Sequence, residues 1–327
     1  MHVPRVSFLS TAYRTEDRVS GMIDSVRAQT DPDWELVVVD NGMSDEMAAI
    51  VTRYSDVDPR VRLLRQENRG VAGGLNTAGA AARGRYVSVL NSDDHVEPEF
   101  CARLGDLLDS RPDLGVACCD AWFFSARTGE RLPLSYMENG GSPRPDPAHV
   151  VTLAELIEGL CPYYTALVRR ELWESYGEFD DTTAAVGDLQ FFLRIAAGGH
   201  AIVVLPDKLA SYSQAVESIS RGGRSVITLE EQREAVVTHF AHESGRPEDL
   251  AALEREIRRS RHRRGVVGAR VALSDGDVAG ARRASREALR QKIDLRTLAI
   301  AAAVAVAPGT TIRMHQRRIA PRPVAAR

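Results

Sequence analysis

The first hundred residues alternate short apolar runs with segments of helical periodicity, and this alternation constrains the fold more than any other feature. The run Glu35–Val39 is continuous and β-branched, which is typical of a strand buried on both faces of a parallel sheet. Similar runs begin near Val6, Val61 and Arg85, with helical patterns or a glycine-rich turn (Gly70–Gly74) between them. The sequence therefore predicts an α/β fold whose mixed, mostly parallel sheet is flanked by helices.

Charge is distributed unevenly along the chain. Its 327 residues carry a formal net charge of −3 and leave room for roughly two domains of about 150 residues. Residues 251–327 hold 18 Lys and Arg against 6 Asp and Glu, a net of +12, so residues 1–250 carry −15. The pattern beyond Ser225 is helical throughout. We therefore expect an acidic α/β domain over residues 1–222, followed by a basic, α-helical C-terminal region over residues 223–327.

Composition excludes several classes of protein. With 44% hydrophobic and 27% charged residues, the chain is neither disordered nor a bundle of membrane spans. No apolar run approaches the ~20 residues that a membrane span requires. The N-terminus also lacks the apolar stretch of a signal peptide. These features predict a cytoplasmic protein, either dissolved or attached peripherally to the inner face of the membrane.

Polar side chains follow three of the expected strands. Thr11 and Tyr13 follow the first strand, Asp40 and Asn41 the second, and Asn91–Asp94 the fourth. Ligands of open α/β sheets bind at the carboxyl ends of the strands. The glycine-rich phosphate loops of nucleotide-binding motifs are absent from these turns. Carboxylates beside a phosphate require a bridging cation, and oxygen ligands suit Mg²⁺ or Mn²⁺. The pattern thus predicts a metal-assisted site for a nucleoside diphosphate.

Five stretches of the sequence carry a resemblance to a known family. They are VSFLSTAYR, SVRAQTDPDWELVVVDNGMSD, DPRVRLLRQENRGVAGGLNTAGAAARGRYVSVLNSDD, RRELWESYGEFDD and GDLQFFLRI, and they cover about residues 5–220. In this order and spacing they resemble the family 2 glycosyltransferases, inverting enzymes of GT-A fold. The resemblance implies a Rossmann-like catalytic domain over residues 1–222, with its nucleotide-binding half in residues 1–100 and its acceptor half in residues 101–222.

The resemblance implies a set of donor-binding residues in the first half. They are Thr11, Tyr13, Asp40, Asn41, Asn76, Ser92 and Asp93. Thr11 and Tyr13 would hold the nucleoside, Tyr13 by stacking on the base, although Tyr13 could also merely end a strand. The family usually has Asp where this chain has Asn41. Because an amide both donates and accepts hydrogen bonds, the choice among UDP, dTDP and GDP donors stays open.

The resemblance also assigns the metal and the catalytic base. Asn91-Ser-Asp93 stands where the family has D-x-D, so Asp93 corresponds to the ligand of Mn²⁺ or Mg²⁺; a solvated turn is the alternative. Asp188 corresponds to the general base. An acceptor hydroxyl is a poor nucleophile at neutral pH, and a carboxylate removes its proton as the new bond forms. The alternative role for Asp188 is a helix N-cap.

Two departures from the family pattern concern positive charge. Where the family often has Y-R-x-H, this chain has Tyr212-Ser-Gln-Ala215, so both cations are missing. Leu75 replaces an arginine that often precedes the Asn of the glycine-rich segment. Diphosphate binding would then depend on other residues. The supporting candidates are Asp94, His95, Arg194 and Arg221.

The resemblance implies transfer of a sugar from a nucleoside-diphosphate donor to a hydroxyl acceptor. The acceptor would be a surface glycan, a lipid-linked sugar or a glycosylated metabolite. Two alternatives stay open: a nucleotidyltransferase, although the chain has only Lys208 and Lys292, and a degenerate sugar-nucleotide-binding or scaffold protein. The basic C-terminal helices favour either peripheral contact with anionic lipid or a helical cap on the domain. Nucleic acid is not expected, because aromatic and basic residues are not interleaved.

Overall fold

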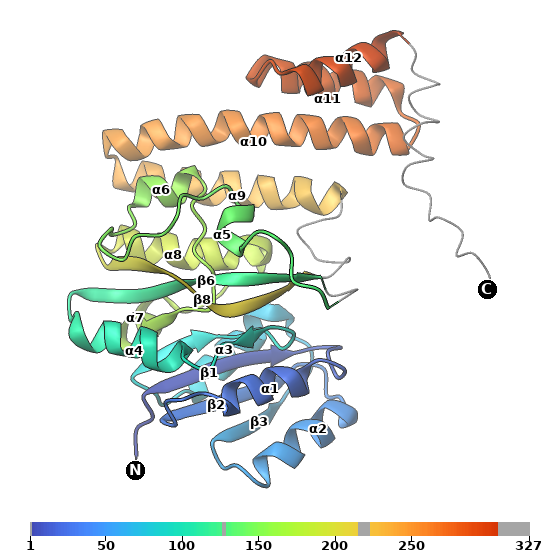
Figure 1. Ribbon diagram of the computed structural model, residues 1–327. Coiled ribbons are helices and arrows are strands. Elements are labelled where there is room, and N and C mark those ends of the chain that lie inside the picture. The colour runs from blue at the N-terminus through green and yellow to red at the C-terminus, as the bar shows by residue number, and fades with distance from the viewer. Residues whose placement is uncertain (1, 126–128, 215–222, 307–327) are drawn as a thin grey trace. The chain divides into compact units, whose positions relative to one another are not determined.

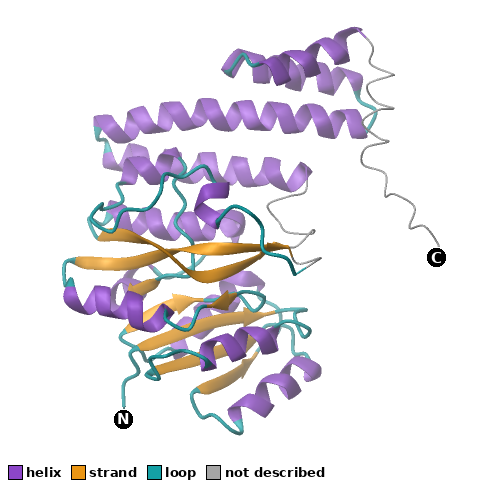
Figure 2. Cartoon of the chain, viewed as in Figure 1, coloured by secondary structure: helices purple, strands orange, loops and turns teal. Residues whose placement is uncertain are grey.

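The computed structural model describes residues 2–125, 129–214 and 223–306. Contacts divide the chain into two compact units, the first ending at residue 216 and the second starting at residue 217. The first unit contains the sheet with its surrounding helices, and the described part of the second is entirely helical (Figures 1 and 2). The mixed α/β fold and the helical C-terminal region expected from the sequence are confirmed.

The described strands of the first unit form one sheet in the order β3-β2-β1-β4-β7-β6-β8-β5. Their bounds are β1 (Val6–Ala12), β2 (Trp34–Asp40), β3 (Val61–Arg65), β4 (Tyr86–Val89), β5 (His95–Val96), β6 (Leu114–Ser125), β7 (Leu167–Arg169) and β8 (Ala201–Gln214). Strands β3, β2, β1 and β4 are mutually parallel, and β6 is parallel to β8. The short β7 joins these two groups by antiparallel pairing with β4 and β6.

Helices cover both faces of the sheet (Figure 2). They are α1 (Val19–Arg27), α2 (Asp45–Ser55), α3 (Gly70–Ala81), α4 (Phe100–Ser110), α5 (Tyr136–Asn139), α6 (Leu153–Glu158), α7 (Arg170–Tyr176), the 3₁₀ helix η1 (Asp181–Val186) and α8 (Gly187–Ala197). Phe8 of β1 faces the core shared with α1, α2 and α4, and its ring lies 5.8 Å from that of Phe100. Thr11, three residues further on, faces Gly74 of α3. Since side chains alternate along a strand, α3 covers the opposite face.

The glycine-rich segment differs from the expectation. Residues 70–74 form the beginning of helix α3 instead of a turn. Glycine is a poor helix former, but packing overrides this weak preference. A Cβ at Gly74 would collide with Thr11, and one at Gly79 would lie 2.6 Å from the indole nitrogen of Trp173. The glycines therefore let a helix approach β1 and α7 at short range.

The second unit contains four described helices. They are α9 (Gly223–Ser244), α10 (Pro247–Ser274), α11 (Val278–Gln291) and α12 (Leu295–Val306). Helix α10 packs against both α9 and α11. Close contact with α11 occurs at Gly265, where a Cβ would lie 2.8 Å from the Cβ of Ala288. None of these helices, nor any other in the described ranges, combines the length and apolarity of a membrane span.

A buried carboxylate fixes the first three strands. All seven residues of β2 are buried, as expected for a strand covered on both faces, and one of them is Glu35. Its carboxylate accepts hydrogen bonds from the Ser7 hydroxyl at 2.6 Å, from the backbone and guanidinium of Arg83, and from Arg62 at 3.0 Å. Burial opposes ionisation, but the hydrogen bonds from Arg83 and Ser7 outweigh it and lower the pKa of Glu35. The ionised side chain thus holds β1, β2, β3 and the chain after α3 together.

We predict that Glu35→Gln lowers the free energy of unfolding of the first unit by about 2–4 kcal/mol at pH 7, because two arginines lose a buried partner. The lowered pKa means that this stabilisation is present above the unfolded-state value and is lost as the pH falls through the folded value. The difference from wild type should therefore shrink below about pH 4.

Urea unfolding followed by tryptophan fluorescence measures this effect, since Trp34, Trp122 and Trp173 all belong to the first unit. Glu46→Gln, at an exposed residue in the first turn of α2, is the matched control and should change little. A Glu35→Gln variant as stable as this control, or an unchanged difference at pH 3, would contradict the assignment.

Candidate active site

The carboxyl ends of β1, β2 and β4 meet at one edge of the sheet. Strand β1 pairs in parallel with β2 on one side and β4 on the other, and Ala12 is directly opposite Asp40. The backbone N–H of Asn41 also donates to the carbonyl of Ala12 at 2.9 Å. The turn Asn91–Asp94 follows β4 at the same edge. Three of the polar segments singled out in the sequence thus lie side by side.

Thr11 has an unused polar atom at this edge. Its Oγ1 is buried and makes no hydrogen bond with any residue in the described ranges. Gly74 of α3 packs closely on this oxygen, since an added Cβ would collide with it, and the Asn41 amide lies 3.4 Å from the position that this Cβ would occupy. Buried hydroxyls normally have a partner. Thr11 is therefore suited to a hydrogen bond with a bound ligand.

Asp40 and Asn41 are both engaged by the protein itself. Asp40 accepts hydrogen bonds from the Ser44 backbone at 3.1 Å and from the Arg65 guanidinium at 3.0 Å. Asn41 donates to the Gly70 carbonyl at 2.8 Å and accepts from the Gln66 amide at 2.7 Å. These bonds attach the segment before α3 to the end of β2. Both side chains therefore stabilise the edge of the site. Because both groups of the Asn41 amide are already hydrogen-bonded, Asn41 has few hydrogen bonds left to offer a ligand.

Tyr13 projects from the same edge and is 44% exposed. Its ring lies over Gly42, where a Cβ would come within 2.9 Å of a ring carbon, and Arg14 lies 5.0 Å from its centroid. Two non-glycine residues in the described ranges have positive φ. They are Arg14, directly after Tyr13, and Met43, directly after Gly42. Such backbone conformations cost of order 1 kcal/mol and concentrate at functional sites. The exposed ring is available for stacking.

In the acidic turn, Ser92, Asp93 and Asp94 face different surroundings. The Ser92 hydroxyl bonds to that of Thr15 at 2.9 Å and is buried. The Asp93 side chain is 27% exposed and accepts from the Arg18 guanidinium at 3.1 Å. Sequence reasoning did not single out Arg18, and the only signal was its place in the segment after β1. It supplies positive charge beside the turn, where the family's Arg and His are missing.

Asp94 points into the protein. One carboxylate oxygen accepts from the Ser213 backbone at 2.8 Å, and the other accepts from the hydroxyls of Tyr163 and Tyr164. Tyr164 also accepts a hydrogen bond from Asn91 at 2.7 Å. Burial, reinforced by the charge of Asp93, raises the pKa of the Asp94 carboxyl well above its usual range. Asp94 therefore holds the acidic turn in place and presents no oxygen to a ligand.

A cluster of aromatic rings, which no sequence pattern predicted, lies beneath the acidic turn. Its members are Phe123, Tyr136, Tyr163, Tyr164 and Tyr212, with neighbouring centroids 4.6–6.4 Å apart. We call it the tyrosine cluster. Tyr212 is the first residue of the segment where the family has Y-R-x-H. Ala215 at its end, like the supporting candidate Arg221, lies outside the described residues.

His95 does not face the acidic turn. Its Nε2 lies against Gly21 of α1, only 2.7 Å from the position of an added Cβ. Burial lowers the pKa of this imidazole, although the charges of Asp93 and Glu97 oppose the shift. A neutral ring packed on a helix gives little support to a diphosphate.

Asn76 joins the two halves of the first unit. Its amide donates to the Phe179 carbonyl and accepts from the Phe179 N–H, each at 3.0 Å. Both hydrogen-bonding groups of the side chain are therefore engaged by the backbone between α7 and η1. In this structure Asn76 positions that segment and does not face a nucleotide directly.

Asp188 lies in the first turn of α8. The N-cap of this helix is Val186, without a side-chain hydrogen bond, so the N-cap role considered for Asp188 is not what the structure shows. Its carboxylate accepts from the Leu189 backbone at 2.8 Å. Tyr136 has a pKa raised first by burial and further by the charges of Cys161 and Asp188. The charge of Asp188 thus acts on a member of the tyrosine cluster, which also contacts Asp94.

Arg194 lies near the end of the same helix, α8. Its Nε and Nη2 are buried and make no hydrogen bond with any side chain or backbone group that the structure describes. Burial lowers the pKa of this guanidinium, against the attraction of Glu178 and Asp180. It therefore carries an unsatisfied positive charge in the half of the unit that also contains Asp188.

The acidic turn fits a particular kind of metal site. Among the described residues, no three His, Cys, Asp or Glu side chains lie close enough to hold a metal ion. Mg²⁺ at nucleotide sites is commonly held by one or two carboxylates together with substrate phosphates. Asp93 supplies one such carboxylate, whereas Asp94 is engaged internally. The residues fit an ion shared with a diphosphate, and not a site made of protein ligands alone.

Known proteins resemble this chain in sequence and in fold. The family model described as Glycosyl transferase family 2 matches residues 7–176. The uncharacterized glycosyltransferase EpsJ of Bacillus subtilis is 26% identical over 219 residues, which are 67% of this chain and 63% of EpsJ. The chain spans between 31% and 63% of the length of the first curated relatives it matches.

Two solved structures share the fold. TarS residues 1–349 of S. aureus, in complex with UDP-GlcNAc, align with a TM-score of 0.62 and 17% identity over 96% of this chain and 90% of TarS. The mannosyltransferase PcManGT from Pyrobaculum calidifontis, in complex with GDP-Man and Mn²⁺, aligns with a TM-score of 0.59 and 20% identity over 97% of this chain and 84% of PcManGT.

The family match begins in β1 and ends in α7, so it includes every strand end that forms the site. It covers more than half of the chain. The neighbouring structures confirm the expected GT-A-like fold. The chain therefore belongs to glycosyl transferase family 2.

Proposed function

We propose that residues 1–222 are a catalytic domain that transfers a sugar, with inversion, from a nucleoside-diphosphate donor to a hydroxyl acceptor. One observation carries this proposal most. The outward carboxylate of Asp93 and the unused hydroxyl of Thr11 lie at the edge where three parallel strands end. Asp188, in the first turn of α8, acts through its charge on Tyr136 of the tyrosine cluster. Family membership supports the same reaction class.

The donor nucleoside is proposed to lie between Tyr13 and Thr11. The exposed Tyr13 ring stacks on the base, and Thr11 uses its unused oxygen for the nucleoside. Asn41 acts indirectly, by fixing the segment before α3. TarS is solved with UDP-GlcNAc and PcManGT with GDP-Man, so we propose a UDP, dTDP or GDP sugar as the donor.

The diphosphate is proposed to lie at the acidic turn. Asp93 would hold Mn²⁺ or Mg²⁺, which when bound would neutralise charge on the leaving diphosphate. PcManGT, which shares the fold, is solved with Mn²⁺. Arg18 lies 3.1 Å from Asp93 and supplies a guanidinium for the phosphates when Asp93 turns to other partners. It thereby takes over part of the role of the missing Arg and His.

Asp188 is proposed to be the general base. Its carboxylate accepts the proton of the acceptor hydroxyl while the oxygen attacks the anomeric carbon from the face opposite the diphosphate. The first turn of α8 favours the ionised carboxylate through the helix dipole. Residues 101–222 would then form the acceptor half, for a surface glycan, a lipid-linked sugar or a glycosylated metabolite. The basic helices after residue 222 add peripheral membrane contact in this proposal.

A non-catalytic sugar-nucleotide binder is the second candidate. Asp93 is held in an ion pair with Arg18, and the Arg and His of the family's Y-R-x-H segment are missing. Incubation with UDP-, dTDP- and GDP-sugars and Mn²⁺ separates the candidates. Released nucleoside diphosphate identifies a transferase, nucleoside triphosphate formed when pyrophosphate is added identifies a nucleotidyltransferase, and binding without turnover identifies the binder.

We predict that Asp93→Ala removes the Mn²⁺-dependent part of the stabilisation by nucleoside diphosphate, because the ion loses its protein ligand. Thermal shifts with UDP, GDP and dTDP, with and without Mn²⁺, measure this; a ligand at 100 times its Kd adds about 2.7 kcal/mol. Asp17→Ala is the matched control, since Asp17 also pairs with Arg18 but lies outside the turn. A full Mn²⁺-dependent shift in Asp93→Ala would refute the assignment.

We predict that Asp188→Asn lowers turnover by roughly 10²–10⁴-fold with nearly unchanged nucleotide affinity, because the base contacts the acceptor and not the donor. Release of nucleoside diphosphate, measured with the most active donor, gives turnover, and thermal shift gives affinity. Glu171→Gln is the control, since Glu171 also lies in the first turn of a helix and is exposed. Near-normal turnover of Asp188→Asn would exclude Asp188 and direct attention to Asp180 or Asp181.

A further inference from the structure

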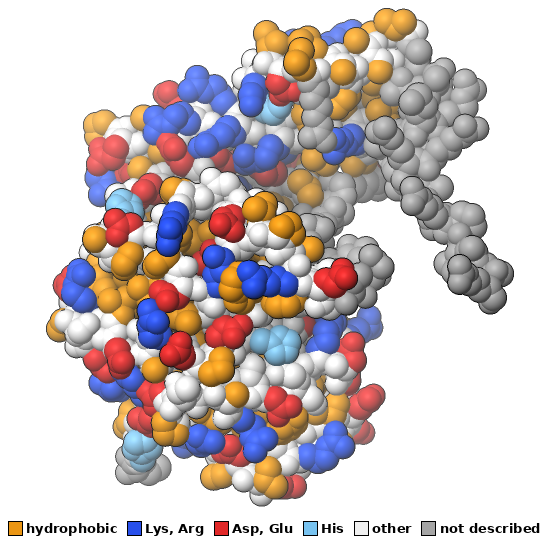
Figure 3. All heavy atoms as spheres, in the orientation of Figure 1, with side chains coloured by type: hydrophobic (Ala, Val, Ile, Leu, Met, Phe, Trp, Pro, Cys, Tyr) orange, Lys and Arg blue, Asp and Glu red, His pale blue; other side chains and the backbone are white. Residues whose placement is uncertain are grey.

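The second unit contains a basic pocket that the proposed reaction does not use. It has a volume of about 580 Å³ and lies between α10 and the end of α11. We call it the α10–α11 pocket. Most of its lining side chains are basic: Arg255, Arg258, Arg259, His262 and Arg263 of α10, and Lys292 after α11. Among the described residues that line it, none is acidic. Figure 3 shows Lys and Arg side chains gathered over these helices.

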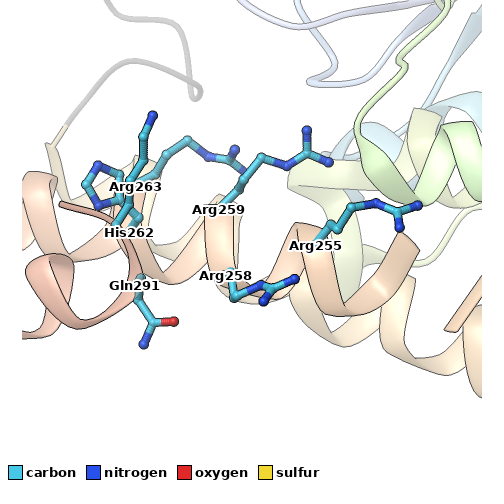
Figure 4. A pocket seen from close by; sticks show the side chains of 7 residues that line it. Arg255, Arg258, Arg259, His262, Arg263 and Gln291 are labelled. Atoms are coloured by element: carbon cyan, nitrogen blue, oxygen red, sulfur yellow. The ribbon is translucent and has the colours of Figure 1, made fainter. Parts of the chain in front are cut away.

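Helical spacing explains how so many cations share one pocket. Arg255, Arg259 and Arg263 are four residues apart and form one row on α10, while Arg258 and His262 form the next row. Figure 4 shows the two rows side by side, with Gln291 of α11 beside them. One helix therefore presents five basic side chains to a single ligand.

Packing against α11 holds the rim of the pocket in place. The close approach of Gly265 to Ala288 brings the two helices together. The His262 ring then bonds through Nδ1 to the Ala288 carbonyl at 3.0 Å, and its Nε2 lies 3.1 Å from Asp294. The segment that carries Lys292 is thereby attached to the same turn of α10. The pocket is therefore preformed.

The charges in the pocket are only partly compensated. Arg263 binds Glu230 and Glu256, and Arg259 lies 3.2 Å from the buried Glu256. By contrast, the Arg258 side chain makes no hydrogen bond or ion pair with any residue in the described part of the chain, whereas Lys292 interacts electrostatically with Asp294. Several like charges within a Debye length repel one another, and an anion relieves this repulsion. The excess positive charge therefore favours a ligand with more than one negative charge.

The surroundings of Lys292 indicate the rest of the ligand. Ile293 and Leu295, just beyond Lys292, are 74% and 87% exposed. Exposed apolar side chains next to a basic site are typical of surfaces that contact the headgroups and chain boundary of a lipid layer. The combination suits an amphiphile, with a charged head for the arginines and an apolar chain for the two exposed residues.

We propose that the α10–α11 pocket binds a phosphate or diphosphate group, and that this group is the head of a membrane lipid. Arginine guanidiniums match phosphate oxygens in pairs of parallel hydrogen bonds, and Lys292 adds a point charge. The site goes beyond the proposed sugar transfer and requires none of the residues of the sheet edge. A soluble phosphate compound offers the same chemistry, and the experiment separates the two sources.

The test uses the full chain in two arms. Isothermal titration with inorganic pyrophosphate measures the shared chemistry, and co-sedimentation with phosphatidylcholine vesicles, with and without phosphatidic acid, measures the lipid source. We expect pyrophosphate binding, and vesicle binding that requires phosphatidic acid. Arg258→Glu should weaken both by about tenfold or more, because it removes an uncompensated guanidinium from the pocket.

Arg286→Glu is the matched control. Arg286 is exposed on α11, outside the pocket and without a described partner, and its replacement changes the net charge equally. It should leave both affinities within about twofold. Without added metal ions, Asp93→Ala should leave pyrophosphate binding intact, which separates this pocket from the metal-dependent donor site. Circular dichroism checks the fold, and Arg258→Gln, expected to weaken binding less than Arg258→Glu, guards against a folding defect.

Three outcomes would overturn the proposal. Absence of binding in both arms removes the site. Equal losses in Arg258→Glu and Arg286→Glu show attraction by net charge and not by a pocket. Pyrophosphate binding without any binding to phosphatidic acid vesicles leaves a phosphate site but refutes the lipid headgroup. None of these results bears on the Asp188 and Asp93 variants, so failure here is distinct from failure of the proposed reaction.

Discussion

The geometry of the candidate site depends on the buried carboxyl group of Asp94. Through the Ser213 backbone it attaches the turn after β4 to β8, and through Tyr163 and Tyr164 it attaches the same turn to the tyrosine cluster. With Asp94 turned inward, its neighbour Asp93 faces outward. The two consecutive acidic residues thus have different roles. Asp94 anchors the turn, and its inward orientation determines where the Asp93 carboxylate lies.

Much of the fold could be predicted from the sequence, because buried parallel strands consist of continuous apolar runs and their carboxyl ends must meet. The polar residues at those ends, from Thr11 to Asp93, were found in this way. The helical start of α3 was not, since glycine argues against a helix until its close approach to Thr11 is known. Packing between segments distant in the sequence, and not local helix propensity, therefore determined the structure of residues 70–74.

The rest of the site depends on contacts that no local pattern encodes. The amide of Asn76 bonds to a backbone 103 residues away, and the imidazole of His95 packs on Gly21, which precedes it by more than 70 residues. In the C-terminal helices the sequence showed a row of arginines. It did not show that Glu230, 33 residues before Arg263, compensates one of them while Arg258 has no such partner. Which arginines keep an uncompensated charge that a ligand could bind therefore depends on the tertiary structure.

The two hydrogen bonds between Asn76 and Phe179 have a consequence for how such a protein diverges. On one side the contact requires a particular side chain, and on the other it uses only main-chain atoms, which every non-proline residue supplies. Substitutions around Phe179 can therefore accumulate without loss of this attachment, whereas Asn76 cannot change freely. The α3 side of this contact is thus tied to one side chain, whereas the segment around Phe179 can acquire new side chains and still keep its attachment to α3.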